Sequence, residues 1–200
     1  ATFKDTYPFN QKEKTDESPT TYKIAWDDKN LYFAFDCVDV DLVAPAMERD
    51  DHVYFHDCVE MFILPEWRLR TYWELVIGPQ GAVFDSLQAK NYNQWGCNSK
   101  KSENIQGLQV GIKLNGTLNR SDDKDNGYVV EIAVPFDQLP GYAKAAPAAG
   151  HTLHCMLVRL DKNATGETND KGEPKMSHKA FAFTPLLSWG HNIWNHARLT

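Results

Sequence analysis

The sequence predicts an all-β fold, an antiparallel two-sheet β-sandwich of the jelly-roll or immunoglobulin-like kind with minor helix. Eight or more short apolar segments recur along the 200 residues, and turn-forming residues separate them. Nowhere do apolar residues recur at helical spacing for more than about two turns. A chain of this length can bury one core, so a single domain spanning residues 1–200 is expected.

Each predicted strand is a short run rich in β-branched and aromatic side chains. Turn sequences such as DDKN at 27–30 and PQG at 79–81 join neighbouring runs and favour hairpins. The predicted strands are residues 21–26, 31–39, 57–64, 71–78, 82–89, 108–114, 128–136, 151–161, 179–184 and 192–200.

Two segments do not read as strands. PFDQLPGYAKAAPAAG predicts a short helical turn that begins near Pro135 and is broken at Pro140–Gly141. Residues 161–177 are polar and rich in Gly and Asn, so a surface loop is expected there.

Composition excludes several functional classes. The formal charge of -6 comes without a Lys/Arg cluster, which argues against nucleic acid as a partner. Without an apolar run near the roughly 18 residues that span a bilayer, no membrane partner is expected. The four cysteines form no CxxC pair, which excludes a zinc knuckle. Cys37, Cys58 and Cys155 lie in strand-like runs and are expected in the core, whereas Cys97 is loop-like.

Three glutamates interrupt strands that are otherwise apolar. Successive side chains of a strand point to opposite faces, so each acid can be assigned to a face. Glu60 in DCVEMFIL, Glu74 in TYWELVIG and Glu131 in YVVEIAVP each lie opposite the main apolar face of their strand. Arg159 shares its face with apolar residues of HTLHCMLVRLD.

A carboxylate among apolar neighbours destabilises a fold unless a partner offsets its lost hydration. One interpretation is an internal ion pair, for instance between Arg159 and Glu74 or Glu131. The other is a groove in which acids such as Glu60, with Arg159, hydrogen-bond to a polyhydroxylated ligand. A sugar has hydroxyl donors and flat C–H faces, so its site needs polar groups together with aromatic rings.

Aromatic residues suitable for such a site are abundant, with six Trp, eight Tyr and ten Phe. Trp67, Trp95, Trp189 and Trp194 lie in or beside segments predicted as loops or strand ends. Large rings outside the core are typical of recognition surfaces, although such a ring can also cover the core as a lid. Trp95 is therefore a candidate ligand contact.

Three longer motifs follow one another along the chain: TYKIAWDDKNLYFAFDCVD, HDCVEMFILP and NGYVVEIAVPF. In this order and spacing they resemble the family 9 carbohydrate-binding modules and their wider carbohydrate-binding-like, DOMON-like relatives. The resemblance runs from about Thr20 to the C-terminus. It implies a non-catalytic β-sandwich module that binds a polysaccharide or oligosaccharide. It also implies a secreted, extracellular or periplasmic protein whose partner is the catalytic domain of a glycan-degrading enzyme.

The resemblance also implies particular binding residues. In the family, two tryptophans sandwich a sugar and a strand glutamate hydrogen-bonds to it. The glutamate falls on Glu60, the first ring falls on Tyr54, and Trp189 is the nearest match to the second ring. Asn192 follows Trp189, whereas the asparagine that the family has before its second tryptophan is missing. Where the family has an arginine in the strand after DxVExF, this chain offers Glu74.

Calcium is the one cofactor considered, since structural calcium ions occur in the family and no organic cofactor is expected. The acidic turn SDDKDNG offers Asp122, Asp123 and Asp125, whose carboxylate oxygens suit a hard cation. The turn lacks the spacing and terminal glutamate of a dedicated calcium loop. A solvated acidic turn is the alternative.

Three other functions stay open. A glycoside hydrolase needs two carboxyl groups roughly 5–10 Å apart, which Glu60, Glu74 and Glu131 could supply. A haem-binding sandwich domain would use Met with His or Lys, although Met61 and Met156 follow the parity of core residues. A ligand-free structural or interaction domain is the third alternative.

Overall fold

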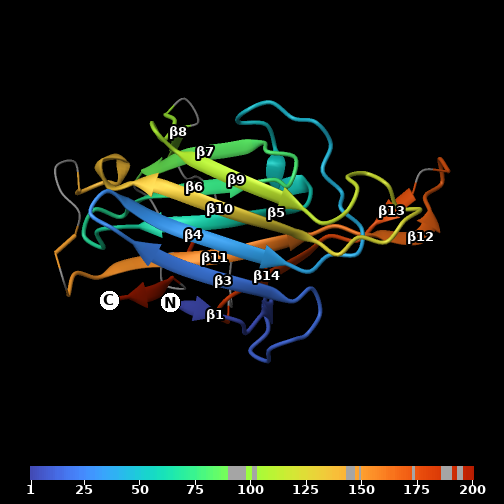
Figure 1. Ribbon diagram of the computed structural model, residues 1–200, viewed down its shortest axis with the longest axis horizontal. Coiled ribbons are helices and arrows are strands. Elements are labelled where there is room, and N and C mark those ends of the chain that lie inside the picture. The colour runs from blue at the N-terminus through green and yellow to red at the C-terminus, as the bar shows by residue number, and fades with distance from the viewer. Residues whose placement is uncertain are drawn as a thin grey trace.

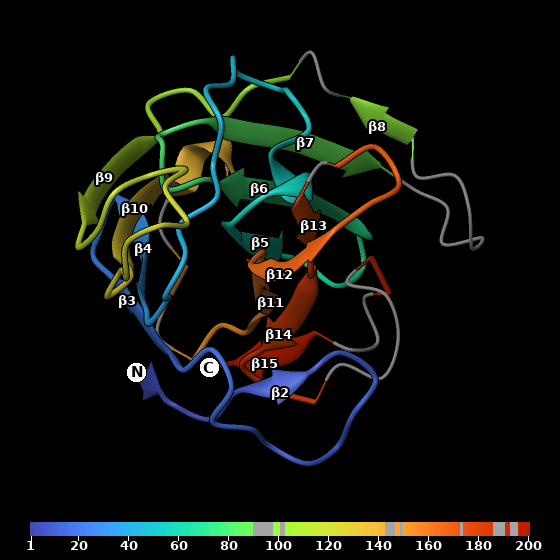
Figure 2. The ribbon, with the colours of Figure 1, turned by 90° about the vertical axis from the view of Figure 1, so that its right-hand side faces the viewer.

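The strands form two stacked antiparallel sheets in a computed structural model that describes residues 1–89, 98–100, 103–142, 147–148, 150–172, 174–185, 191–192 and 196–200. Figures 1 and 2 show the two layers, with the smaller sheet facing the viewer in Figure 1. Each described strand pairing is antiparallel. The predicted all-β sandwich is therefore confirmed.

The smaller sheet has five strands in the order β1 (Thr2–Phe3), β3 (Thr20–Trp26), β4 (Asn30–Cys37), β10 (Tyr128–Pro135) and β9 (Gln109–Leu114). The larger sheet has eight strands. Seven follow the order β2 (Tyr7–Pro8), β14 (Lys179–Ala182), β11 (Leu153–Asp161), β5 (Cys58–Leu64), β6 (Thr71–Ile77), β7 (Val83–Ala89) and β8 (Asn98–Lys100). The eighth, β15 (Ala197–Leu199), pairs with β11.

The predicted hairpins and helical turn are present. Asp27 closes the β3–β4 turn because its Oδ1 accepts hydrogen bonds from the amides of Lys29 (2.7 Å) and Asn30 (2.8 Å). Two short 3₁₀-helices are described, η1 (Val53–Phe55) and η2 (Phe136–Gln138), and η2 follows Pro135 as expected. Neither they nor any other helix in the described ranges has the length and apolar character to cross a membrane.

The loop predicted for residues 161–177 is wrong in part. β12 (Ala164–Thr168) and β13 (Pro174–Met176) pair there as a two-stranded hairpin that projects from one end of the molecule (Figure 1). Their pattern was missed because exposed polar residues form this hairpin, so hydrophobic alternation gives no signal.

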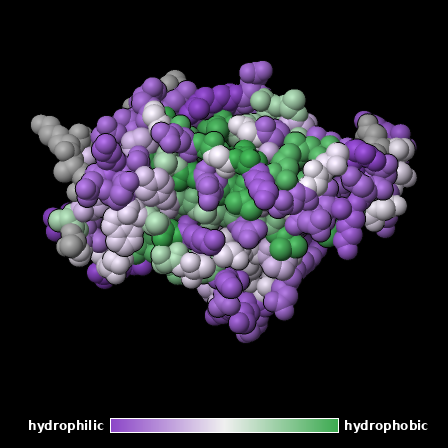
Figure 3. All heavy atoms as spheres, viewed as in Figure 1, coloured by the Kyte–Doolittle hydropathy of each residue, from purple (hydrophilic) through white to green (hydrophobic). Residues whose placement is uncertain are grey.

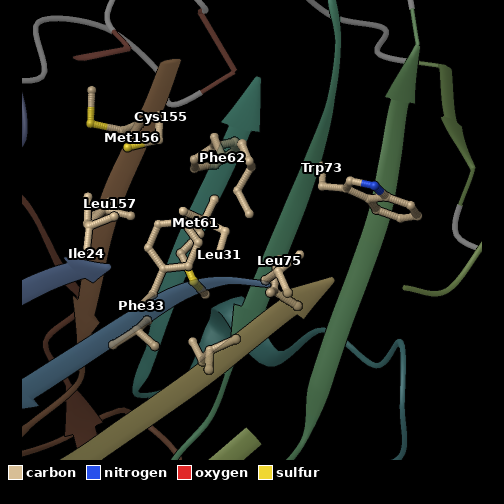
Figure 4. Packing of buried hydrophobic residues seen from close by; sticks show 14 of the residues in the cluster. Ile24, Leu31, Phe33, Met61, Phe62, Trp73, Leu75, Cys155, Met156 and Leu157 are labelled. Atoms are coloured by element: carbon tan, nitrogen blue, oxygen red, sulfur yellow. The ribbon is translucent and has the colours of Figure 1, made fainter. Parts of the chain in front are cut away.

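The core lies between the two sheets. Leu31 and Phe33 from β4 meet Met61 from β5 and Leu75 from β6, all at most 1% exposed (Figure 4). The three described cysteines, Cys37, Cys58 and Cys155, are buried and unbridged, as expected for small core residues.

The outer face of the smaller sheet carries a shallow hollow of about 590 Å³. Small residues line it, among them Ala25, Ala34 and Gly111, together with Tyr32 and Glu131. Figure 3 shows this side of the molecule, where an apolar area is interrupted and surrounded by hydrophilic side chains. Glu131 is exposed here, on the far side of the smaller sheet from the core.

Candidate functional site

Glu60 and Glu74 lie on the outer face of the larger sheet. β5 directs Val59, Met61 and Ile63 into the core, so the strand's alternation turns Glu60 to the opposite face. The same alternation in β6 turns Glu74 outward. The assignment of both acids by position along the strand is therefore confirmed.

The two glutamates are diagonal neighbours on adjacent strands. Glu60 pairs with Val76 across the β5–β6 ladder, and Glu74 pairs with Phe62. Diagonal positions on one face lie about 7–8 Å apart, which long side chains can bridge. One ligand group can therefore reach both carboxylates.

The Glu60 carboxylate is buried, and no partner for it lies among the described residues. The residue is 9% exposed, and the described part of the chain gives its carboxylate no hydrogen bond and no ion pair. Burial, together with the smaller effect of the nearby charge of Glu74, raises its pKa to about 8. A buried polar group in this state destabilises the fold, so it calls for a functional explanation.

Glu74 is held in place by its neighbours. Gln88 Nε2 donates a hydrogen bond of 2.6 Å to Glu74 Oε2, and His191 Nε2 lies 3.6 Å from Glu74 Oε1. Tyr72 Oη and His191 Nδ1 are 2.8 Å apart. Burial lowers the pKa of His191 to about 4, so its ring is neutral near pH 7.

Tyr54 lies near the two carboxylates and belongs to a cluster of aromatic rings. The half-buried ring of Tyr54 packs edge-to-face on Phe84, with 5.5 Å between centroids, and on Phe55 at 4.9 Å. Burial raises the pKa of Tyr54, and the charges of Glu74 and Glu60 add to the rise, so the phenol lies near both acids. Phe55 is 56% exposed beside it.

His191 contacts the surroundings of Glu74 through its ring as well. Its ring packs edge-to-face on Phe62 at 5.2 Å between centroids. Phe62 is the cross-strand partner of Glu74, so this contact also places His191 near Glu74. His191 and Tyr54 both lie outside β5 and β6. This group of Tyr54, Glu60, Glu74, Gln88 and His191 is called the acidic patch below.

The structure brings together only some of the predicted binding residues. Tyr54 and Glu60 lie close enough for the charge of Glu60 to act on the Tyr54 phenol, and their role in binding stays a prediction. Asn192, next to His191, is half-buried. Trp189 and Trp95 lie outside the described residues, so their proposed contacts stay predictions.

Arg159 lies elsewhere, in the interior between the sheets. It is 0% exposed, and its Nη2 donates to Asp39 Oδ2 at 2.7 Å and to Asp161 Oδ1 at 2.9 Å. An internal ion pair exists as one interpretation predicted, but pairing with Glu74 or Glu131 is wrong. The reason is geometric, because Arg159 points inward whereas both glutamates point away from the core.

The acidic turn predicted to hold calcium does not gather its three acids. Asp125 is buried, and its two oxygens accept hydrogen bonds from the amides of Leu42 and Thr117, each at 2.7 Å. Exposed Asp122 instead pairs with Arg120 at 3.1 Å. Asp123 is also exposed.

A different set of acids does converge. Asp39, Asp57 and Asp161 each place a carboxylate oxygen within 4.8 Å of the others, and all three are buried. Asp57 accepts hydrogen bonds from the amides of Val43 (2.5 Å) and Lys162 (2.6 Å). The Arg159 guanidinium pairs with two of these three carboxylates, Asp39 and Asp161. Three converging carboxylates are a donor set that a hard cation fits chemically.

Three residues of this region are not predicted from the sequence: Gln88 and His191 in the acidic patch, and Phe55 beside it. Phe55 stands just outside the motif HDCVEMFILP and carries no signal of its own, and Gln88 gives none because amides are ordinary on a strand. His191 approaches Phe62 and Tyr72 from a distance of more than 100 residues in sequence. Only tertiary structure reveals such a contact.

Comparisons with known proteins identify the family. The family model described as "Carbohydrate family 9 binding domain-like" matches residues 2–179. A search of curated proteins found no match. A crystal structure from Bacteroides uniformis, named as that of a candidate carbohydrate-binding protein, aligns with a TM-score of 0.65 at 15% identity, covering 98% of this chain and 85% of that one.

A second solved structure is a family 9 carbohydrate-binding module from Caldicellulosiruptor kristjanssonii in complex with glucose. It aligns with a TM-score of 0.52 at 14% identity, covering 92% of this chain and 76% of that one. Structural likeness at these identities shows a shared fold. Because the family model spans nearly the whole chain, this protein belongs to the carbohydrate family 9 binding domain-like family.

Proposed function

We propose that this domain binds a carbohydrate at the acidic patch without catalysing a reaction. One observation carries the proposal: the Glu60 carboxylate is 9% exposed and has no hydrogen-bond donor in the described part of the chain. Sugar hydroxyls supply such donors, and the rings of Tyr54 and Phe55 offer faces for sugar C–H groups. Membership of a carbohydrate-binding family supports the same function.

Glycan binding to the purified domain tests this proposal. A glycan array that includes glucose, the ligand of the structural relative, should show binding, and calorimetry should then measure the affinity. Tyr54→Ala and Phe55→Ala should each weaken binding about tenfold or more, because a stacked ring contributes roughly 1–2 kcal/mol. Trp189→Ala tests the second ring predicted from the sequence. Absence of binding to every glycan would overturn the proposal.

The hydrolase alternative has one observation in its favour, since Glu60 and Glu74 are neighbouring acids with different environments. A chromogenic glycoside series separates the two functions. We expect no turnover above that of a Glu60→Gln control. Turnover that disappears in Glu60→Gln would replace binding by catalysis.

A structural calcium ion is proposed at the cluster of Asp39, Asp57 and Asp161 rather than at the acidic turn. Melting temperature should rise with added Ca²⁺ and fall with a chelator. Asp122→Ala and Asp123→Ala, which change exposed side chains, should leave that response intact. A response lost in these two variants would place the ion at the turn instead.

Secretion and attachment to a glycan-degrading enzyme are proposed from the family alone.

A further inference from the structure

An exposed aromatic ring adjoins the acidic patch. Phe55 is 56% exposed although it is a large apolar residue. Its ring centroid lies 4.9 Å from that of Tyr54, which itself lies near Glu60 and Glu74. A ligand that contacts Tyr54 in the patch can therefore reach Phe55 with a neighbouring part of the same molecule.

The segment that carries both rings is fixed at several points. Val53, the first residue of η1, is fully buried. The Phe55 amide donates to the His52 carbonyl oxygen at 3.1 Å, and the Phe55 carbonyl oxygen accepts from Lys162 Nζ at 3.0 Å. The His52 ring packs on Phe55 with 5.6 Å between centroids. The rings are thus positioned before a ligand arrives, which reduces the conformational entropy lost on binding.

The planes of the Tyr54 and Phe55 rings are inclined by 69°. Sugar units stack on aromatic rings through their flat C–H faces, so two consecutive units that each cover one of these rings must present inclined faces. A β-1,4-linked glucose chain is an extended ribbon whose consecutive faces are nearly parallel. A β-1,3-linked or α-1,4-linked chain turns at each linkage, so its consecutive faces are inclined. The two rings therefore match a chain that turns.

We propose that the domain binds a glycan chain that turns between consecutive units, with one unit on Tyr54 and the next on Phe55. This inference rests on the proposed function and names the class of carbohydrate that the same site takes. Tyr54 holds the unit that contacts the acidic patch, and Phe55 selects the linkage to the next unit. Neither ring contact requires an ionised glutamate.

Calorimetry on the whole domain with glucose and three glucose trimers tests this inference. The trimers share sugar and length and differ in linkage: maltotriose is α-1,4-linked, laminaritriose is β-1,3-linked and cellotriose is β-1,4-linked. We expect at least one of the two turning trimers to bind about tenfold more tightly than cellotriose and glucose, because it alone places a second unit on Phe55. Cellotriose that binds as tightly as both turning trimers would overturn the inference.

Variants assign the preference to the exposed ring. In Phe55→Ala, the ratio of affinities for the preferred trimer and cellotriose should fall towards one, whereas Phe55→Tyr keeps a ring and should keep the ratio. The ratio within one variant is insensitive to partial loss of folded protein, which would change both affinities alike. Trp26→Ala is the matched control, because it removes a 63% exposed ring from the end of β3 in the other sheet, and its ratio should equal that of the wild type.

Other outcomes would overturn the inference in distinguishable ways. A preference for a turning trimer that persists in Phe55→Ala would show that another part of the site selects the linkage. Equal binding of glucose and all three trimers, lost in Tyr54→Ala, would keep carbohydrate binding and show a site for a single unit. Binding of another glycan but of none of these four would overturn the inference for glucose chains and keep the proposed function. Absence of binding to every glycan would remove the proposed function itself.

Discussion

At the scale of single residues, the central feature is a carboxylate whose position reduces stability. Glu60 is surrounded by apolar strand residues and by a second acid, and no donor among the described residues offsets its burial. Sites that bind ligands are commonly less stable than the rest of a fold, because their polar groups find partners only in the complex. Replacing Glu60 should therefore separate stability from binding.

Glu60→Gln should stabilise the free protein, and the gain should grow with pH. The folded pKa of about 8 exceeds the ordinary value of 4.5, so the folded state holds the proton more tightly than the unfolded state does. The wild type consequently loses stability as pH rises between these values, by up to a few kcal/mol.

Urea unfolding at about pH 5 and pH 8 measures this effect. The difference between Glu60→Gln and wild type should be small at the lower pH and larger at the higher pH. The groups facing Glu60 are Glu74, Tyr54 and Cys58, and they are unchanged in both proteins. A constant difference across this range would show that Glu60 does not carry a raised pKa.

At the scale of elements, strand alternation predicts most of the fold and the orientation of the two glutamates of the acidic patch. Period-two patterns in β5, β6 and β10 assign Glu60, Glu74 and Glu131 to their faces correctly. The same patterns do not predict that Glu60 and Glu74 are buried while Glu131 is exposed. That difference depends on Tyr54 and His191, which approach the sheet from other segments.

Turn geometry gives an independent test of the β10 element. Gly127 precedes β10 with a φ of 111°, and a side chain there would clash with the Cys37 carbonyl oxygen of β4. Gly127→Ala should cost about 2–3 kcal/mol in unfolding free energy.

Gly166→Ala in the β12–β13 hairpin is the matched control for this test. Gly166 also has a positive φ, of 77°, but has open space around it. Gly166→Ala should lower the unfolding free energy by only about 1 kcal/mol, because the backbone is strained there but the new side chain meets no clash. Equal losses in the two variants would contradict the close approach of β4 and β10 at Gly127.

At the scale of the whole molecule, a buried ion-pair network joins the two sheets. Arg159 belongs to β11 of the larger sheet, whereas Asp39 follows β4 of the smaller one. The Arg159 guanidinium also donates to the Val38 carbonyl oxygen at 2.5 Å. The sequence predicted Arg159 in a ligand site because its charge is evident from sequence, whereas two of its partners, Val38 and Asp39, lie 120 or more residues away in the loop after β4.

Arg159→Met should destabilise the domain by about 3–5 kcal/mol, because it leaves Asp39 and Asp161 buried beside Asp57 without a counter-charge. Arg120→Met, which removes the exposed pair with Asp122, should change stability little. Chemical denaturation compares the two. Similar small effects in both variants would show that the interior network does not hold the sheets together.

The buried Glu60 carboxyl has no partner in the described part of the chain, and on the proposed function a carbohydrate provides one. Calorimetric titration of wild type, Glu60→Gln and the control Glu131→Gln with the tightest-binding glycan tests this claim most directly. At about pH 9, where the Glu60 carboxyl is ionised, we expect Glu60→Gln to lose at least about tenfold in affinity, in line with the loss of a charge-assisted hydrogen bond, while Glu131→Gln binds as the wild type does. Unchanged affinity in a folded Glu60→Gln protein would contradict the account.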